Sequence, residues 1–234
     1  WIFFIAHCDF IFATSFIQKK GIKLAVFGTL GSLIKVDRMK LLKDCFLSEG
    51  VKISPGELEM WCGACEKEVV VHHCFMKNIE EKSPKILRSY YKKLEQSNCS
   101  LTCPSVVDII ESLKSGGIKV ILTTYSPSFV QEAMLSQVGL KELADDYISE
   151  YDLKDNLNPG LIKSISQQHG VNSLGEIALF SCNRDRIKQG VMGQYGFIAG
   201  VGDSFENKKD LEYAGATRTY DSLEGLRHLT DRTL

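Results

Sequence analysis

The loop at residues 28–33 is the first place in this chain where side chains could do chemistry. Residues 22–27 form an apolar run typical of a buried parallel strand, and the run ends in a turn that contains Gly28 and Gly31. The turns that follow such strands form the ligand-binding edge of open α/β sheets. Ser32 has a hydroxyl group that could act as a nucleophile, but no histidine lies at an evident activating position. The segment also has no carboxylate, so the sequence predicts a site-forming loop with little chemistry of its own.

A second group of reactive side chains is Cys62, Cys65, His72 and Cys74, which fall within thirteen residues. Thiolates and imidazoles are the ligands that bind Zn²⁺ tetrahedrally. The same segment has helical spacing, which favours buried core thiols over a metal centre. A C-x-x-C pair has weight only with a second ligand pair at a known spacing, so we favour the core interpretation. The expected apolar stripe consists of Leu58, Cys62, Cys65, Val69, His72 or His73, and Met76.

Composition limits the class of protein. The chain has 234 residues, of which 44% are hydrophobic, and this is enough for one large domain or for a domain with an insertion. The net charge of −1 provides no basic surface, which argues against nucleic acid as a partner. Eight cysteines are scattered through a chain too large to need disulfides, so we expect reduced thiols and a cytoplasmic protein.

Residues 1–17 are almost wholly apolar apart from His7 and Asp9, and the sequence does not begin with Met. The positive charge at Lys19 and Lys20 follows the apolar run, whereas a secretory signal carries it first. The run is short for a membrane span, and Asp9 lies near its middle. We rank three interpretations: a non-native or truncated leader, then an element packed on the domain, then a signal anchor. A membrane is an expected partner only in the third.

The elements that must position these side chains alternate between strands and helices from residue 22 onward. This order predicts a doubly wound, Rossmann-like parallel α/β sheet. Strands are expected at 22–27, 118–124, 147–151, 176–181, 197–201 and 216–220. Helices are expected at 128–139, 159–169, 184–194, 206–214 and 222–230.

About eighty residues between the first two strands read as helices, expected at 37–49, 55–78, 80–97 and 104–115. Proline near the helix starts and glycine after the helix ends support these bounds. An all-helical insertion after the first strand predicts a cap domain over the carboxyl edge of the sheet. The expected organisation is a leader at 1–20, an α/β core at 21–36 and 104–234, and a helical cap at 37–103.

The apolar strand and the sequence Gly28-Thr29-Leu30 resemble the Asp-x-Asp-Gly-Thr/Ser-Leu motif of the haloacid dehalogenase superfamily, with Gly28 and Leu30 in place of the two aspartates. With its helical insertion, the chain is similar to the phosphoglycolate phosphatase and phosphonoacetaldehyde hydrolase group. The resemblance implies that Thr123 or Thr124 hydrogen-bonds a phosphate oxygen. The alternative is that two β-branched residues simply end a strand.

The third and fourth motifs of that family are also altered. Asn156 stands at the lysine position of the third motif, where Lys154 could substitute. In one register of the fourth motif, Cys182 replaces the metal-binding aspartate and Arg186 replaces the acidic residue four positions later. In the other register Asp203 is the motif aspartate and Lys188 is the cation. We favour the first register by about two to one, because it uses all six strands with short connections.

The resemblance implies a reaction in which one aspartate attacks phosphorus, a second protonates the leaving group, and carboxylates hold Mg²⁺. Because Gly28 and Leu30 stand where the motif has aspartates, we expect no bound cofactor and a loss of turnover on the order of a million-fold. The leading hypothesis is an inactive domain that binds a small phosphorylated ligand or a protein partner. The alternatives are an active, Mg²⁺-dependent small-molecule phosphatase that uses Asp203, and the product of a decayed gene.

Overall fold

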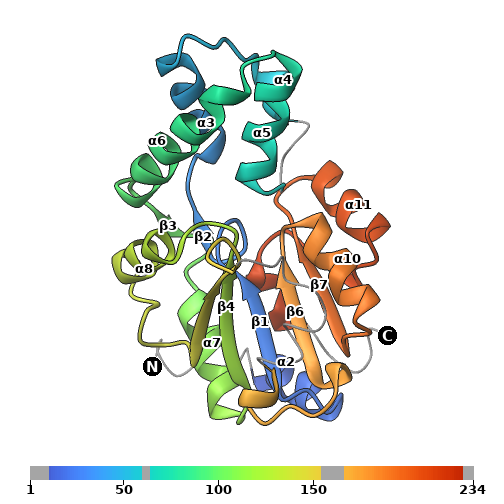
Figure 1. Cartoon of the computed structure of the whole chain (residues 1–234). Coiled ribbons are helices and arrows are strands. Elements are labelled where there is room, and N and C mark those ends of the chain that lie inside the picture. The colour runs from blue at the N-terminus through green and yellow to red at the C-terminus, as the bar shows by residue number, and fades with distance from the viewer. Residues whose placement is uncertain (1–10, 60–63, 154–165, 229–234) are drawn as a thin grey trace.

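The computed structural model describes residues 11–59, 64–153 and 166–228. Its centre is a six-stranded parallel sheet with the strand order β5-β4-β1-β6-β7-β8 (Figure 1). The α/β fold expected from the alternating pattern is therefore confirmed. The strands are β1 (Leu24–Gly28), β4 (Lys119–Thr124), β5 (Asp146–Ser149), β6 (Ile177–Ser181), β7 (Phe197–Val201) and β8 (Arg218–Tyr220).

Successive residues of β1 face opposite layers of the protein, as strand geometry requires. Ala25 and Phe27 pack into one apolar cluster, and Leu24 and Val26 pack into the other. Helices cover both faces of the sheet, which is why every residue of β1 is buried. The helices around the sheet are α2 (Ile11–Lys19), α7 (Val106–Ser115), α8 (Ser128–Gln137), α10 (Arg184–Met192) and α11 (Phe205–Tyr213), with 3₁₀ turns η2 (Leu174–Glu176) and η3 (Leu223–His228).

Part of the apolar N-terminal segment is a helix on the domain. Within α2, Phe16 makes an edge contact with Phe197, with ring centroids 5.9 Å apart. The Thr14 hydroxyl group lies 2.8 Å from that of Ser112 on α7. For residues 11–19, the structure agrees with the second interpretation given above, an element packed on the domain. Residues 1–10 lie outside the described residues. No helix in the described ranges is long and apolar enough to cross a bilayer.

Four helices lie between two short strands that cross from the sheet to the insertion and back (Figure 1). The two crossings, β2 (Ile34–Lys35) and β3 (Ser100–Leu101), pair antiparallel, with Ile34 opposite Leu101. The helices share one apolar cluster with a face of the sheet, so their core is continuous with that of the domain. They are α3 (Arg38–Ser48), α4 (Pro55–Glu59), α5 (Glu66–Met76) and α6 (Ser83–Glu95), with a 3₁₀ turn, η1 (Glu80–Lys82).

Two helix predictions were wrong in detail. The helix expected at 55–78 is two helices, because Cys65 is extended and begins α5 anew. The buried face of α5 is formed by Glu66, Val69, Val70, His73 and Cys74, whereas Met76 and His72 are exposed. The expected stripe therefore does not form. The helix expected at 222–230 is the 3₁₀ turn η3.

Candidate functional site

The candidate site lies where β1, β4 and β6 end at the carboxyl edge of the sheet. Strand pairing places Gly28 opposite Thr123, and Phe27 opposite Phe180 on β6. Gly28, Leu30, Thr123, Thr124 and Cys182 therefore surround one small cavity, which we call the closed cavity on account of its small volume. Its volume is about 20 Å³, which is room for about one water molecule.

The hydroxyl groups of the loop after β1 are engaged within the protein. Thr29 Oγ1 accepts a hydrogen bond of 3.0 Å from Gln131 Nε2. Ser32 Oγ accepts one of 3.0 Å from the Cys182 backbone N–H. Both residues are fully buried. Ser32 is therefore a structural link between the loops after β1 and β6, which leaves it poorly placed to act as a nucleophile.

The side chain of Arg186 fills the site from α10. Asn183 caps this helix and accepts a hydrogen bond of 2.9 Å from the Arg186 backbone N–H, which fixes Arg186 in the first turn. Arg186 Nη1 donates to Thr123 Oγ1 at 2.6 Å, and its guanidinium carbon lies 4.4 Å from the centre of the Tyr125 ring. The Thr123 hydroxyl in turn donates to the Phe27 carbonyl at 3.1 Å. Only 4% of Arg186 is exposed.

Glu150 supplies the charge that balances Arg186. It follows β5 directly, is 8% exposed, and forms an ion pair with the guanidinium. Burial raises the pKa of the Glu150 carboxyl to about 7, although Arg186 acts in the opposite direction. Burial also raises the pKa of the neighbouring Tyr125 phenol above its usual range. The floor of the site is therefore a buried guanidinium in direct contact with a buried carboxyl group.

The insertion closes the same cavity from above. Arg38 Nη1 donates to Glu66 Oε1 at 3.0 Å, and Tyr90 Oη donates to the same oxygen at 3.3 Å. Arg38 and Glu66 both line the closed cavity. The rings of Tyr91 on α6 and Tyr151 after β5 are in edge contact, with their centroids 5.1 Å apart. A second ion pair and an aromatic contact therefore join the insertion to the core.

These residues do not fit Mg²⁺. The ion needs a cage of hard oxygen ligands, and carboxylates normally supply its charge. Gly28 has no side-chain ligand, Cys182 offers a soft sulfur, and Arg186 brings a positive charge to the place where the cation would bind. Glu66 is the carboxylate among the described residues that line the closed cavity, and it is bonded to Arg38. The residues that line the closed cavity therefore do not form a site for Mg²⁺.

The other expected site residues are dispersed. Lys188 lies on α10, half exposed, 3.7 Å from Asp185. Asp203 follows β7 and does not line the closed cavity. Cys182 does line it, and its Sγ donates to the Leu30 carbonyl at 3.2 Å. Lys154 and Asn156 lie outside the described residues.

The residues of the alternative zinc interpretation do not come together where they are described. Cys74 is buried and His72 is exposed on the same helix, whereas Cys65 precedes its first turn. Across the ranges that the structure covers, no three His, Cys, Asp or Glu residues form a group that could hold a metal ion. Cys62 lies outside those ranges. Within the described ranges, no disulfide joins the cysteines Cys45, Cys65, Cys74, Cys99, Cys103 and Cys182.

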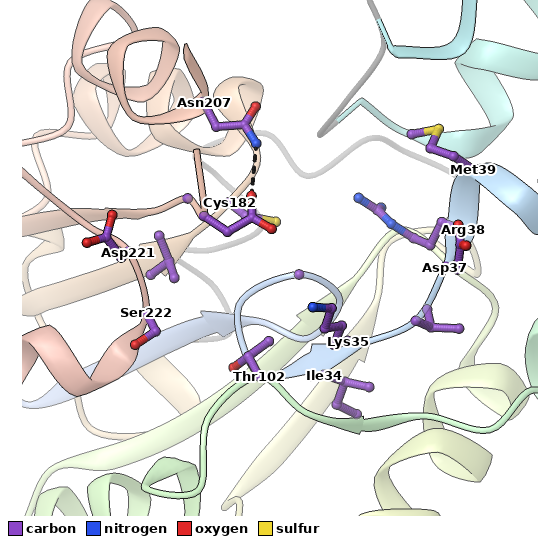
Figure 2. Close-up of a pocket in the computed structure, with 15 residues that line it drawn as sticks. Ile34, Lys35, Asp37, Arg38, Met39, Thr102, Cys182, Asn207, Asp221 and Ser222 are labelled. Carbon is purple, nitrogen blue, oxygen red and sulfur yellow. Dashed lines mark hydrogen bonds between the residues drawn. The ribbon is translucent and has the colours of Figure 1, made fainter. Parts of the chain in front are cut away.

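A larger pocket lies beside the closed cavity, and we call it the open pocket (Figure 2). Its volume is about 430 Å³, within the range of small-molecule sites. Lys35 and Arg38 lie on one side, and Cys182, Asn207 and Asp221 lie on the other (Figure 2). The open pocket lies between the ends of β6 to β8 and the segment that leads from β2 into α3.

Sequence reasoning missed three of the groups that define these sites: Glu150, Glu66 and Lys35. Glu150 carries the clearest signal, because a carboxylate directly after a predicted strand lies at the ligand-binding edge of the sheet. Glu66 lies in the first turn of a helix that was predicted to run through this position. Lys35 lies beside an expected domain boundary, and nothing in its local sequence distinguishes it from a solvated surface lysine.

The described structure is similar to solved structures of haloacid dehalogenase-like proteins, although no family model and no curated protein matches the sequence. A predicted phosphoglycolate phosphatase from Haemophilus somnus has a TM-score of 0.72 and 15% identity, over 88% of this chain and 96% of that one. A phosphonoacetaldehyde hydrolase-like protein from Oleispira antarctica has a TM-score of 0.72 and 15% identity, over 88% and 90%. A conserved haloacid dehalogenase-like protein from Agrobacterium tumefaciens has a TM-score of 0.69 and 18% identity, over 88% and 96%.

At these identities the likeness concerns the fold. The chain therefore has the haloacid dehalogenase-like α/β fold that its sequence motifs predicted.

Proposed function

We propose that this protein uses a haloacid dehalogenase-like fold for binding or regulation and does not hydrolyse phosphate esters. The observation that carries the proposal is the Arg186 guanidinium beside Gly28. It lies at the end of β1, where the family resemblance implies a nucleophile and a metal ion. The cavity has a volume of about 20 Å³, which holds about one water molecule. A phosphate group is larger than a water molecule and does not fit.

We also propose that helices α3 to α6 act as a cap. Support comes from Arg38 and Glu66, which line the cavity at the end of β1, and from Tyr90, which donates a hydrogen bond to Glu66. In a working phosphatase of this architecture, a cap must leave room for substrate. Here the cap and the floor are both closed by ion pairs, which leaves little room for substrate in the closed cavity.

A phosphatase assay tests the proposal directly. The purified full chain, with Mg²⁺, is incubated with para-nitrophenyl phosphate or phosphoglycolate beside two variants, Asp203→Ala and Cys182→Ala, prepared identically. We expect all three proteins to show the same background rate. A Mg²⁺-dependent rate in the wild type that either variant abolishes would overturn the proposal. Loss in Asp203→Ala would favour an active phosphatase that uses Asp203.

A further inference from the structure

The open pocket presents two opposite charges that the protein itself leaves uncompensated. Lys35, on β2, has no ion-pair partner in the part of the chain that the structure describes, and its side chain points into the open pocket (Figure 2). Asp203, after β7, accepts a hydrogen bond of 3.3 Å from Asn207 Nδ2 and has no cation beside it among the described residues. An ammonium group and a carboxylate therefore line the same pocket without meeting each other.

The other charged groups of the open pocket are already engaged. Arg38 is bonded to Glu66 at 3.0 Å. Asp221 pairs with Lys208. Asp37 is the N-cap of α3, where it accepts a hydrogen bond of 3.0 Å from the Lys40 backbone N–H and the positive end of the helix dipole favours its charge. Lys35 and Asp203 are thus the ionic groups of this pocket that remain to be satisfied by a ligand.

Apolar side chains occupy the space between these charges. Ile34, Val36 and Met39 line the side of Lys35, and Val201 lines the side of Asp203. An aliphatic segment fits such walls, because it removes apolar surface from water on both partners. A ligand that satisfies the whole pocket therefore has an anion at one end, a cation at the other, and methylene groups between them.

We propose that the open pocket binds a small aliphatic zwitterion, with its carboxylate on Lys35 and its primary ammonium on Asp203. This inference names the ligand class for the proposed binding role, on which it rests, but it does not depend on the absence of hydrolysis. The site is displaced from Gly28 and Arg186, which do not line it. A single-charged molecule would leave one of the two side chains unsatisfied and would bind more weakly.

The experiment uses ω-amino acids as probes of length. Isothermal titration of the full chain with glycine, β-alanine, 4-aminobutanoate, 5-aminopentanoate and 6-aminohexanoate measures binding against the number of methylene groups. Pentanoate and pentylamine are the single-charge controls. We expect saturable binding with an optimum at one chain length, and binding of the two controls weaker by about tenfold or more, the usual effect of losing one hydrogen bond to a charged group.

Variants identify the site. Lys35→Met and Asp203→Asn should each weaken binding of the best probe by about tenfold, and Lys52→Met, at an exposed lysine outside the pocket, should leave it unchanged. The exchange variant Lys35→Asp/Asp203→Lys should recover binding, because the zwitterion can reverse its direction. All these positions are exposed, so an unchanged melting temperature shows that each variant is folded.

Three results would overturn the inference. The first is the absence of saturable binding by any probe at concentrations on the order of 10 mM. The second is equal binding of pentanoate and the best amino acid, which would indicate an anion site. The third is binding that Lys35→Met does not change. Hydrolysis of phosphate esters in the separate assay would contradict the proposed function and leave these outcomes unaffected.

Discussion

The closed cavity and the open pocket lie at the same edge of the sheet but balance their charges in opposite ways. In the closed cavity, Arg186 is paired with Glu150, and Arg38 is paired with Glu66. In the open pocket, Lys35 and Asp203 line the same space without a partner of opposite charge among the described residues. A site whose ionisable groups are already paired within the protein offers little to a charged ligand, whereas a site with separated charges can bind one.

The proposed function implies that one fold can keep a ligand-binding edge without the chemistry that such edges support. The strands still bring Gly28, Thr123 and Cys182 together. A buried ion pair between Arg186 and Glu150 lies at the same place. Burying each charged group of such a pair costs free energy, and the attraction between the two groups offsets this cost. The protein is therefore destabilised when only one partner is removed.

The largest expected effect comes from removing Glu150 and leaving Arg186 in place. Glu150→Leu should lower the free energy of unfolding by about 3–5 kcal/mol, because a buried guanidinium cannot lose its proton. Arg186→Met should cost less, since Glu150 can take up a proton. Urea denaturation at neutral pH measures both.

The control is the double variant Glu150→Leu/Arg186→Met, which replaces the pair with apolar groups and should recover most of the loss. In the open pocket, Asp203→Asn should change the same free energy by less than about 0.5 kcal/mol, as is usual at exposed positions. Equal costs for Glu150→Leu and Asp203→Asn would remove the contrast between the two sites.

A smaller effect should appear as a dependence on pH. The folded state raises the pKa of Glu150 from 4.5 to about 7, so between these values it holds a proton that the unfolded chain releases. The stabilising contribution is complete below 4.5 and is lost as the pH rises through about 7. We expect the wild type to lose at most about 3 kcal/mol across this window relative to the double variant.

Urea denaturation at intervals from about pH 4 to about pH 8.5, on the wild type and the double variant, measures this difference. Stability of the wild type that rises with pH relative to the double variant would mean that Arg186 depresses the pKa of Glu150 below 4.5. The closed cavity would then hold a fully ionised pair.

The smallest effect concerns the wall between the two sites. Gly31 lines the open pocket with a φ of +83°, and a Cβ there would overlap Cys182 Sγ, which lines both sites. Gly31→Ala should cost about 1 kcal/mol more than Gly50→Ala, whose φ of +72° carries similar strain with nothing within 4 Å. Thermal denaturation compares the two. Adding Cys182→Ala should remove the excess, and an excess that persists would show that Gly31 meets another obstacle.

Much of the sheet could be predicted from the sequence, because each strand is a short apolar run bounded by turn residues. Strand β7, at 197–201, has the bounds that were expected. The helix expected at 55–78 was wrong because apolar spacing continues through Cys65, where the backbone is extended. Apolar periodicity indicates which residues could share one face of a helix, but it does not reveal where the helix is interrupted.

The floor of the closed cavity was harder to predict. The family resemblance marked Arg186 as a replacement for an acidic residue, but not as the partner of Glu150. The two residues follow β6 and β5, and in the sheet these strands are separated by β4 and β1. Their contact depends on the length of the Arg186 side chain reaching across two strands, which no local pattern encodes.

The paired crossings β2 and β3 have a mechanical consequence. Lys35 is part of the ribbon that attaches the insertion, whereas Asp203 belongs to the core. A tilt of the insertion about this ribbon would therefore change the separation of Lys35 and Asp203, while Gly28 and Arg186, both in the core, would keep theirs. A molecule bound between Lys35 and Asp203 would act as a strut, and its length would set the angle at which the insertion rests on the sheet.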